Sequence, residues 1–320
     1  MKMLLVTILT SSALALSAMA EENLNAAHSL QPETSLLTMS AVKGHKSRVI
    51  ELKVRNEGKN DLPIVFEIGG KDAASFRVIE APKNLRAKGD GILKIAFYPA
   101  NGARLYQADL QIEEANVTRN VEIRGIGLDA FEGNNEPPLQ QIVTALGIPL
   151  KVGGETLSLN SEKASIGESV DVSYFRVAEG KSFQVRPLAR FSPAGETPIG
   201  LIFSDSKGKK EIGRLMVSTP EIPDAHQSVF PLFSDGNSSL KVTPSKEEFG
   251  FYMDGHHYVS FTDPARQKDA QVKRTARVYP VKELGGKVLE NAWMVCFEEA
   301  KNGDYQDVML LIENVAPVKK

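Results

Sequence analysis

Five oxygen-bearing side chains gather near the end of the chain, within residues 298–307. The segment AWMVCFEEAKNGDYQDVMLLIENV (residues 292–315) places Glu298, Glu299, Asn302, Asp304 and Asp307 between two apolar runs. Calcium binds about six to eight oxygens, which carboxylates and backbone carbonyls can supply together. Four carboxylates crowded without a cation would repel one another. The pattern therefore makes these five residues a candidate Ca²⁺ site.

A second interpretation of the same segment stays open. The acids can be solvated turn residues, with Asp304 bonded to its own backbone as turn aspartates are, and their spacing is not that of an EF-hand loop. Asn302-Gly303 is a dipeptide favoured where both central turn residues have positive φ. We therefore expect a tight hairpin that joins residues 293–297 to residues 308–312. Because both runs are apolar at consecutive positions, the hairpin should be central and covered on both faces.

Aromatic residues cluster around a second predicted turn, at Asp254-Gly255. Strand alternation assigns most of them to the core. The alternative is a sugar-binding platform formed by Tyr252, His257 and Tyr258, because apolar sugar faces pack on aromatic rings. His256 and His257 are adjacent, so in a strand they would point to opposite faces and could not share one metal.

Signatures of catalysis are missing from the sequence. It contains neither G-x-S-x-G nor H-E-x-x-H. The single cysteine, Cys296, cannot form an internal disulfide and lies among apolar neighbours, where an inert buried thiol is expected. We therefore predict no catalytic residue. Carboxylate pairs of glycoside hydrolases have no sequence signature, so a carbohydrate-active hydrolase that uses acids of the C-terminal half stays an alternative.

The first twenty residues have the three parts of a signal peptide. Lys2 is followed by an apolar run and then by Ala18-Met19-Ala20, the small-x-small pattern at which a signal peptidase cuts. No later apolar run approaches the roughly 20 residues of a membrane span. We expect an exported protein, periplasmic or extracellular, with no membrane span in the mature chain.

The charge of the chain is nearly balanced. It has 38 basic and 40 acidic residues, a net charge of −2, and loss of Lys2 with the leader leaves about −3. Such a balance creates no long-range field to recruit nucleic acid or an anionic membrane. We therefore expect no nucleic-acid partner.

Residues 41–128 alternate apolar and polar positions, with turn residues every eight to twelve, and this predicts six or seven short strands in an antiparallel sandwich. The same region contains four short motifs: an N-x-G turn at 56–58, a D-A-x-x-F step that ends at Phe76, F-x-P at 97–99 and G-x-G at 125–127. Together they resemble the hydin-like (ASH-type, choice-of-anchor D) immunoglobulin-like domain. The resemblance implies a seven-stranded sandwich that serves as a spacer or docking module, without catalytic residues.

Residues 129–138 lose this alternation and gather Gly, Asn and Pro, which indicates a linker. A short helix is expected next, because Leu139, Ile142, Val143 and Leu146 have helical spacing. Strand periodicity returns from Ile148, which predicts a larger jelly-roll-like sandwich. Segments of this region, above all the closing F-E-E-x-x-N-x-D-x-x-D, resemble a domain of unknown function in secreted bacterial proteins.

The sequence thus predicts an all-β chain of two tandem antiparallel β-sandwiches with one short helix after the linker. The expected parts are a signal peptide (1–20), an N-terminal linker (21–40), an Ig-like domain (41–128), a linker (129–138) and a C-terminal sandwich (139–316). The expected function is non-catalytic: an exported binding, adhesion or spacer protein whose partner is a glycan or a cell-surface or envelope protein. A purely structural envelope or matrix component is the remaining alternative.

Overall fold

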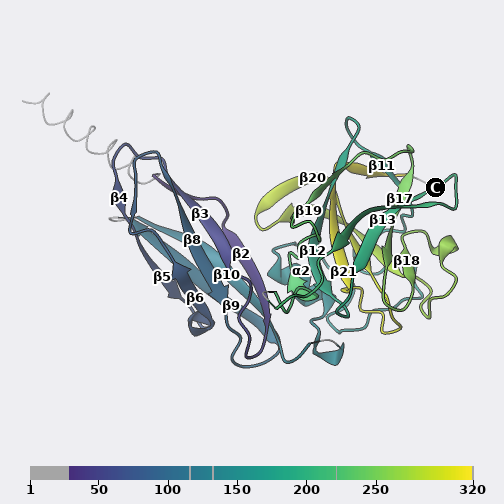
Figure 1. Ribbon diagram of the computed structural model, residues 1–320, viewed down its shortest axis with the longest axis horizontal. Coiled ribbons are helices and arrows are strands. Elements are labelled where there is room, and N and C mark those ends of the chain that lie inside the picture. Colours follow the sequence, from purple (N-terminus) through teal and green to yellow (C-terminus); the bar gives the residue numbers. More distant parts are fainter. Residues whose placement is uncertain (1–28, 115–116, 132, 221, 319–320) are drawn as a thin grey trace, which may run out of the picture.

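A computed structural model describes residues 29–114, 117–131, 133–220 and 222–318, and these fold into two β-sandwiches connected near one short helix (Figure 1). The predicted signal peptide lies outside the described residues. Within them, no helix is both long and apolar enough to cross a membrane. The all-β prediction with one short α-helix is confirmed for this part of the chain.

The first sandwich consists of two four-stranded sheets, ordered β1-β3-β8-β6 and β2-β10-β9-β5, with a small β4-β7 pair. Its elements are β1 (Leu30–Pro32), β2 (Leu36–Val42), β3 (Ile50–Asn56), β4 (Leu62–Pro63), β5 (Val65–Gly69), the 3₁₀ turn η1 (Ala73–Ser75), β6 (Phe76–Glu80), β7 (Asn84–Leu85), β8 (Asp90–Phe97), β9 (Arg104–Glu114) and β10 (Val117–Leu128). All pairs are antiparallel except β2 with β10, which is parallel.

The start of the first sandwich differs from the prediction. Residues 21–40 were expected to be a linker, but β1 pairs with β3 and β2 pairs with β10 along its whole length. Leu37 and Met39 point into the core between the sheets. The sandwich therefore includes strands that precede Ala41, and the short apolar run LLTMSAV was the signal for one of them.

The motifs that carry the family resemblance have packing roles. Asn56 is fully buried, and its side-chain amide donates to the carbonyls of Asn60, Leu85 and Arg86 while its oxygen accepts from the Gly58 N–H. At Gly125 an added Cβ would lie 2.4 Å from the ring of Phe97. The N-x-G turn is thus required by the hydrogen bonds of the buried Asn56 side chain. The G-x-G step is required because only glycine lets the strand approach the Phe97 ring this closely.

The second sandwich consists of a sheet ordered β14-β13-β17-β11-β22 with β18 beside β17, and a sheet ordered β15-β12-β21-β20-β19 with β16 beside β12. Its elements are β11 (Phe175–Val177), β12 (Phe183–Phe191), β13 (Thr197–Phe203), β14 (Lys209–Leu215), β15 (Gln227–Val229), β16 (Leu240–Val242), β17 (Phe249–Asp254), β18 (Val259–Phe261), the 3₁₀ turn η3 (Pro264–Arg266), β19 (Ala276–Leu284), β20 (Lys287–Phe297), β21 (Val308–Glu313) and β22 (Val315–Pro317). These pairs are antiparallel.

Strand β21 and residues 292–297 of β20 lie within their sheet and are covered on both faces, whereas residues 287–291 of β20 are largely exposed. Met294 and Cys296 belong to one apolar cluster, whereas Val295 and Phe297 belong to another. The prediction of a central pair without an exposed face is confirmed. The consecutive apolar residues of this segment follow from that position, because each face of the strands meets a different core.

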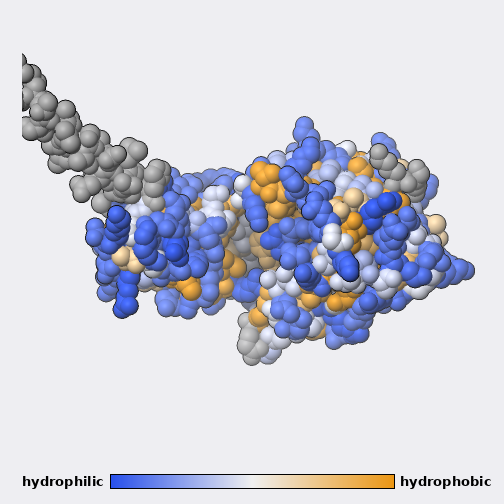
Figure 2. All heavy atoms as spheres, turned by 90° about the horizontal axis from the view of Figure 1, so that it is seen from above, coloured by the Kyte–Doolittle hydropathy of each residue, from blue (hydrophilic) through white to orange (hydrophobic). Residues whose placement is uncertain are grey.

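The helix α2 (Leu139–Ala145) packs at the junction of the two sandwiches. It follows the 3₁₀ turn η2 (Gly133–Asn135), begins after Pro138 and ends before Gly147, whose φ of +66° suits a residue without a Cβ. Its buried side chains share one cluster with Ile126 and Leu128 of the first sandwich. In Figure 2 hydrophilic residues predominate on the visible face of the first sandwich.

Candidate cation site

Residues 293–297 pair with residues 308–312 as the predicted hairpin requires, but the connection between them is a folded loop and not a tight turn. Phe297 pairs with Val308, so residues 298–307 lie outside the ladder. Positive φ occurs at Gly303 (71°) and Tyr305 (59°) rather than at both residues of the Asn302-Gly303 pair. The Leu159 N–H donates to the Gly303 carbonyl, so another segment covers this loop. We refer to residues 298–307 as the acidic turn.

The acidic turn is buried. The exposed fractions are 0% for Glu298, 2% for Glu299, 0% for Asp304 and 5% for Asp307, whereas Asn302 is exposed. The interpretation of these four acids as solvated turn residues is therefore wrong. Burial of a carboxylate costs free energy unless charge and hydrogen bonds compensate it, so the partners of each acid decide what the site can do.

Backbone amides hold the carboxylates in place. Glu298 accepts from the Ala300 N–H at 2.7 Å and from the Asp304 N–H at 2.8 Å, one through each oxygen. Asp307 Oδ2 accepts from the Glu299 N–H at 2.6 Å. The Gln306 backbone N–H, two residues along the chain, also donates to Asp304, which is the bond expected of a turn aspartate. The loop wraps around its acids and aims them at a common centre.

The acids that converge are Glu298, Asp304 and Asp307. One carboxylate oxygen of each lies within 4.8 Å of the others. Two oxygens on one calcium ion are separated by at most about twice the bond length of roughly 2.3–2.6 Å. The observed spacing fits that limit, so this cluster could hold a metal ion. Glu299 lies beside it: its Oε2 accepts from the His256 N–H at 2.8 Å.

Several oxygens around the cluster lack a donor. Among the described residues, the buried Glu299 Oε1, Asp304 Oδ1 and Gln306 Oε1 have no hydrogen-bond partner. Leaving a buried acceptor unsatisfied costs about 1–3 kcal/mol, more if it is charged. A cation coordinated by oxygens would satisfy these acceptors and offset the carboxylate charge. The orphaned atoms therefore favour a hard cation independently of the acid count.

Burial raises the pKa of every acid in the turn, and repulsion by neighbouring carboxylates adds to the rise for Asp304 and Asp307. Desolvation, followed by the charges of Glu298 and Glu136, raises the pKa of Asp304 to about 9. Desolvation and the neighbouring carboxylates also raise the pKa of Asp307 well above its ordinary value. The pKa values of Glu298 and Glu299 rise for the same first reason. Without a positive charge, this site favours protonated acids.

A buried arginine supplies only part of that charge. Arg190 is fully buried, and desolvation lowers its pKa to about 10 against the opposing charges of Glu299 and Asp307. Its guanidinium donates to Ser192 Oγ and to the carbonyls of Met216, Pro193 and Gly195. These partners commit the guanidinium elsewhere, so it cannot pair directly with the converging acids.

Three residues of the site were not recognised in the sequence. Gln306 is fully buried, and its Nε2 donates to Asp304 Oδ2 and to Glu136 Oε2, both at 3.1 Å. Gln227 Nε2 donates to the other oxygen of Glu136 at 2.9 Å. Gln306 lies in the sequence between Asp304 and Asp307, two predicted ligands, and this position could have identified it as part of the site. Glu136 and Gln227 are distant in sequence, and only the tertiary fold brings them here.

The aromatic residues proposed as a sugar platform do not share an exposed face. Tyr252 is 4% exposed, lies near Phe261 and is covered by Lys209, whose Nζ is 5.0 Å from its ring centroid. Tyr258 is 9% exposed and its hydroxyl donates to the Ala300 carbonyl. His257 is exposed. Burial of the two tyrosines in separate environments removes the stacking surface that the pattern suggested.

The structure also shows the surroundings of the single cysteine, the adjacent histidines and Arg277. Cys296 is a free, fully buried thiol, and desolvation raises its pKa far above the ordinary value. His256 and His257 are exposed in the loop between β17 and β18, not in a strand, with ring centroids 5.1 Å apart. Arg277 is 2% exposed and donates to the carbonyls of Lys163 and Asn160.

Comparison with known proteins finds only distant likenesses among solved structures. No family model and no curated protein matches this sequence. Solved structures match distantly. The ASH/PapD-like domain 7 of human CEP192 is 16% identical, with 33% of this chain and 89% of that one covered and a TM-score of 0.27. The Pseudomonas aeruginosa CupB2 chaperone is 14% identical over 70% and 92% of the two chains, with a TM-score of 0.28.

A third structure, a putative carbohydrate binding protein from Bacteroides ovatus, is 7% identical over 86% of this chain and 70% of that one, with a TM-score of 0.26. At such values the likeness carries no conclusion about this chain. By its own topology the chain is a protein of two β-sandwiches with a buried acidic cluster. The resemblance of its C-terminal half to a secreted bacterial domain stays a prediction.

Proposed function

We propose that this protein is an exported, non-catalytic binding or spacer module whose second sandwich is stabilised by a calcium ion in the acidic turn. The observation that carries the proposal is the convergence of Glu298, Asp304 and Asp307 beside buried oxygens that find no donor among the described residues. Oxygen ligands alone suit a hard cation, and calcium tolerates an irregular set of them.

The residues would have distinct roles. Glu298, Asp304 and Asp307 would ligate the ion. The side-chain oxygens of Glu299 and Gln306 would serve as further ligands or accept from ion-bound water. Asn302 is exposed and donates to Asp304 Oδ2, so it would orient that ligand rather than bind the ion. The role of the ion is structural, because the turn is closed to a large substrate by its burial.

The same burial counts against the use of these acids in hydrolysis. A glycosidase places two carboxyl groups about 5–9.5 Å apart on either side of an accessible bond. Here the oxygens lie within 4.8 Å of one another and no acid of the turn is more than 5% exposed. A polysaccharide could not reach them. A hydrolase would need acids from elsewhere in the second sandwich.

A glycan is the ligand class that we propose for the binding role. A cavity of about 320 Å³ lies beside the acidic turn and is lined by His257, Tyr258, Asp269, Gln271 and Lys301 with Ala300. Polar side chains dominate its lining, and their hydrogen-bonding groups suit the hydroxyls of a sugar. The cavity replaces the three-residue platform as the place to look for sugar contacts.

Isothermal titration with Ca²⁺ tests the cation role, on chelator-stripped protein with Mg²⁺ as the competing ion. One bound calcium per chain, lost in Asp304→Asn and Asp307→Asn, is the expected result. Absence of calcium binding by the wild-type protein would overturn it. A glycan array and a screen of polysaccharides for released reducing ends, both run with calcium, distinguish the binding role from the hydrolase alternative.

A further inference from the structure

The acidic turn is connected to the junction between the sandwiches by buried side chains. Glu136 belongs to the segment between the two sandwiches, immediately before α2, and is 9% exposed. One of its oxygens accepts from Gln306 of the acidic turn and the other accepts from Gln227 of β15. A single carboxylate thus joins three segments that are far apart in the sequence.

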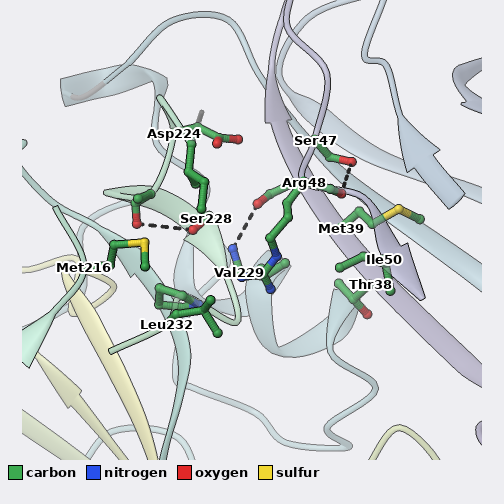
Figure 3. A pocket seen from close by; sticks show the side chains of 14 residues that line it. Thr38, Met39, Ser47, Arg48, Ile50, Met216, Asp224, Ser228, Val229 and Leu232 are labelled. Carbon is green, nitrogen blue, oxygen red and sulfur yellow. Dashed lines mark hydrogen bonds between the residues drawn. The ribbon is translucent and has the colours of Figure 1, made fainter. Parts of the chain in front are cut away.

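The Gln227 end of this connection reaches the first sandwich. In β15, next to Gln227, the Val229 N–H donates to Ser40 Oγ of β2 at 2.9 Å. The Phe230 carbonyl accepts from Arg48 Nη2 of the first sandwich at 3.0 Å. Figure 3 shows Arg48 and Ser47 on one side of this junction, with Asp224, Ser228 and Val229 on the other. The junction is therefore held by specific polar contacts on both sides.

The Gln306 end of this connection lies between Glu136 and the converging acids. Its Nε2 is shared between Asp304 and Glu136, and its Oε1 has no partner among the described residues. A cation that binds Asp304 and this Oε1 would fix the amide with its N–H groups toward Glu136. Outer-shell groups that orient a ligand in this way change metal affinity by about 10–100-fold when they are removed.

We propose that the cation in the acidic turn fixes the junction between the two sandwiches, through Gln306, Glu136 and Gln227. The inference rests on the proposed calcium site and gives its ion a second role: an oxygen-ligated divalent cation in the acidic turn holds the two sandwiches in a fixed arrangement at their junction. Glu136 is a positioning residue in this scheme, because it contacts the Gln306 side chain and lies outside the converging acids.

Amide hydrogen exchange of the whole chain, with Ca²⁺ and with chelator, tests the coupling. In the wild-type protein calcium should slow exchange in residues 298–307 and also in residues 225–233. The expected change at 225–233 is about tenfold, the effect of one charge-assisted hydrogen bond. In Glu136→Gln, which disrupts the bridge while preserving the side-chain shape, the slowing should persist at 298–307 and be lost at 225–233.

Glu155→Gln, a change of an exposed acid, is the matched control and should behave as the wild type. Protection confined to 298–307 in the wild type would overturn the coupling and leave the calcium site standing. Full protection of 225–233 in Glu136→Gln would also overturn it. No calcium binding in the titration removes both proposals. If Glu136→Gln does not fold, the wild-type comparison with and without calcium still decides the question.

Discussion

Asp304→Asn provides the sharpest test of the acidic turn. Asp304 is fully buried, one of its oxygens lacks a donor among the described residues, and the residue is one of the three converging acids. Calcium at about 100 times its dissociation constant should stabilise the wild-type second sandwich by about 2.7 kcal/mol. For a domain of about 150–250 residues, each kcal/mol shifts Tm by about 2–4 °C. The expected rise is therefore roughly 5–11 °C, worked from those two relations.

The variant should lose that rise, because asparagine supplies no charge to the ion. In chelator near pH 7 the two proteins should differ little, since the raised pKa of Asp304, about 9, makes its carboxyl neutral there. Asn and a protonated Asp are nearly isosteric, so we expect a difference within about 1 kcal/mol. The effect of the substitution thus depends on calcium, which a packing defect would not produce.

Differential scanning calorimetry of the wild-type protein and of Asp304→Asn, each in Ca²⁺, in Mg²⁺ and in chelator, measures these Tm values in one series. Asp269→Asn is the matched control, because Asp269 is exposed and lies outside the converging acids. A calcium-induced rise that survives in Asp304→Asn would show that the ion binds elsewhere. A wild-type protein with the same Tm in calcium and chelator would refute the reasoning about the site altogether.

Three further results are expected. Without calcium, Tm should fall as pH rises from about 4 toward 9, because folding raises the pKa of Asp304 from 3.8 to about 9. The stability that the protonated carboxyl contributes is complete below the unfolded pKa and is lost as pH rises through the folded pKa. Calcium should flatten this dependence, and a Tm that rises over the same range in chelator would contradict the burial argument. Cys296 should not react with a thiol reagent in the native protein at pH 8 and should give one equivalent in denaturant, since it is fully buried and desolvation raises its pKa; labelling of the native protein would mean that the sheet opens. Gly125→Ala should destabilise the first sandwich by about 1–3 kcal/mol, because the added Cβ would lie 2.4 Å from the Phe97 ring. Gly69→Ala is the control, because no atom lies within 4 Å of its added Cβ, and equal Tm values for the two variants would contradict the prediction.

Local patterns in the sequence determined much of this protein. Alternating apolar residues predict strands because side chains of a strand point to opposite faces, and the doubly apolar runs of β20 and β21 correctly indicated strands with a core on each side. The helix was predicted through Leu139, Ile142 and Val143, whose spacing places them on one helical face. These features depend on neighbours within a few residues, which a sequence displays directly.

Only the tertiary structure decided what surrounds the acidic turn. Nothing in the spacing of Glu298, Asp304 and Asp307 shows that other segments cover them, and that cover turns a solvated loop into a buried site with raised pKa values. Tyr252 and Tyr258 show the reverse case, since packing removed the face that their positions suggested. Glu136 and Gln227 join the site from distant segments. Desolvation and long-range contacts arise from the three-dimensional arrangement of the chain. They decide whether a cluster of acids is a group of solvated surface residues or a buried site that could bind an ion.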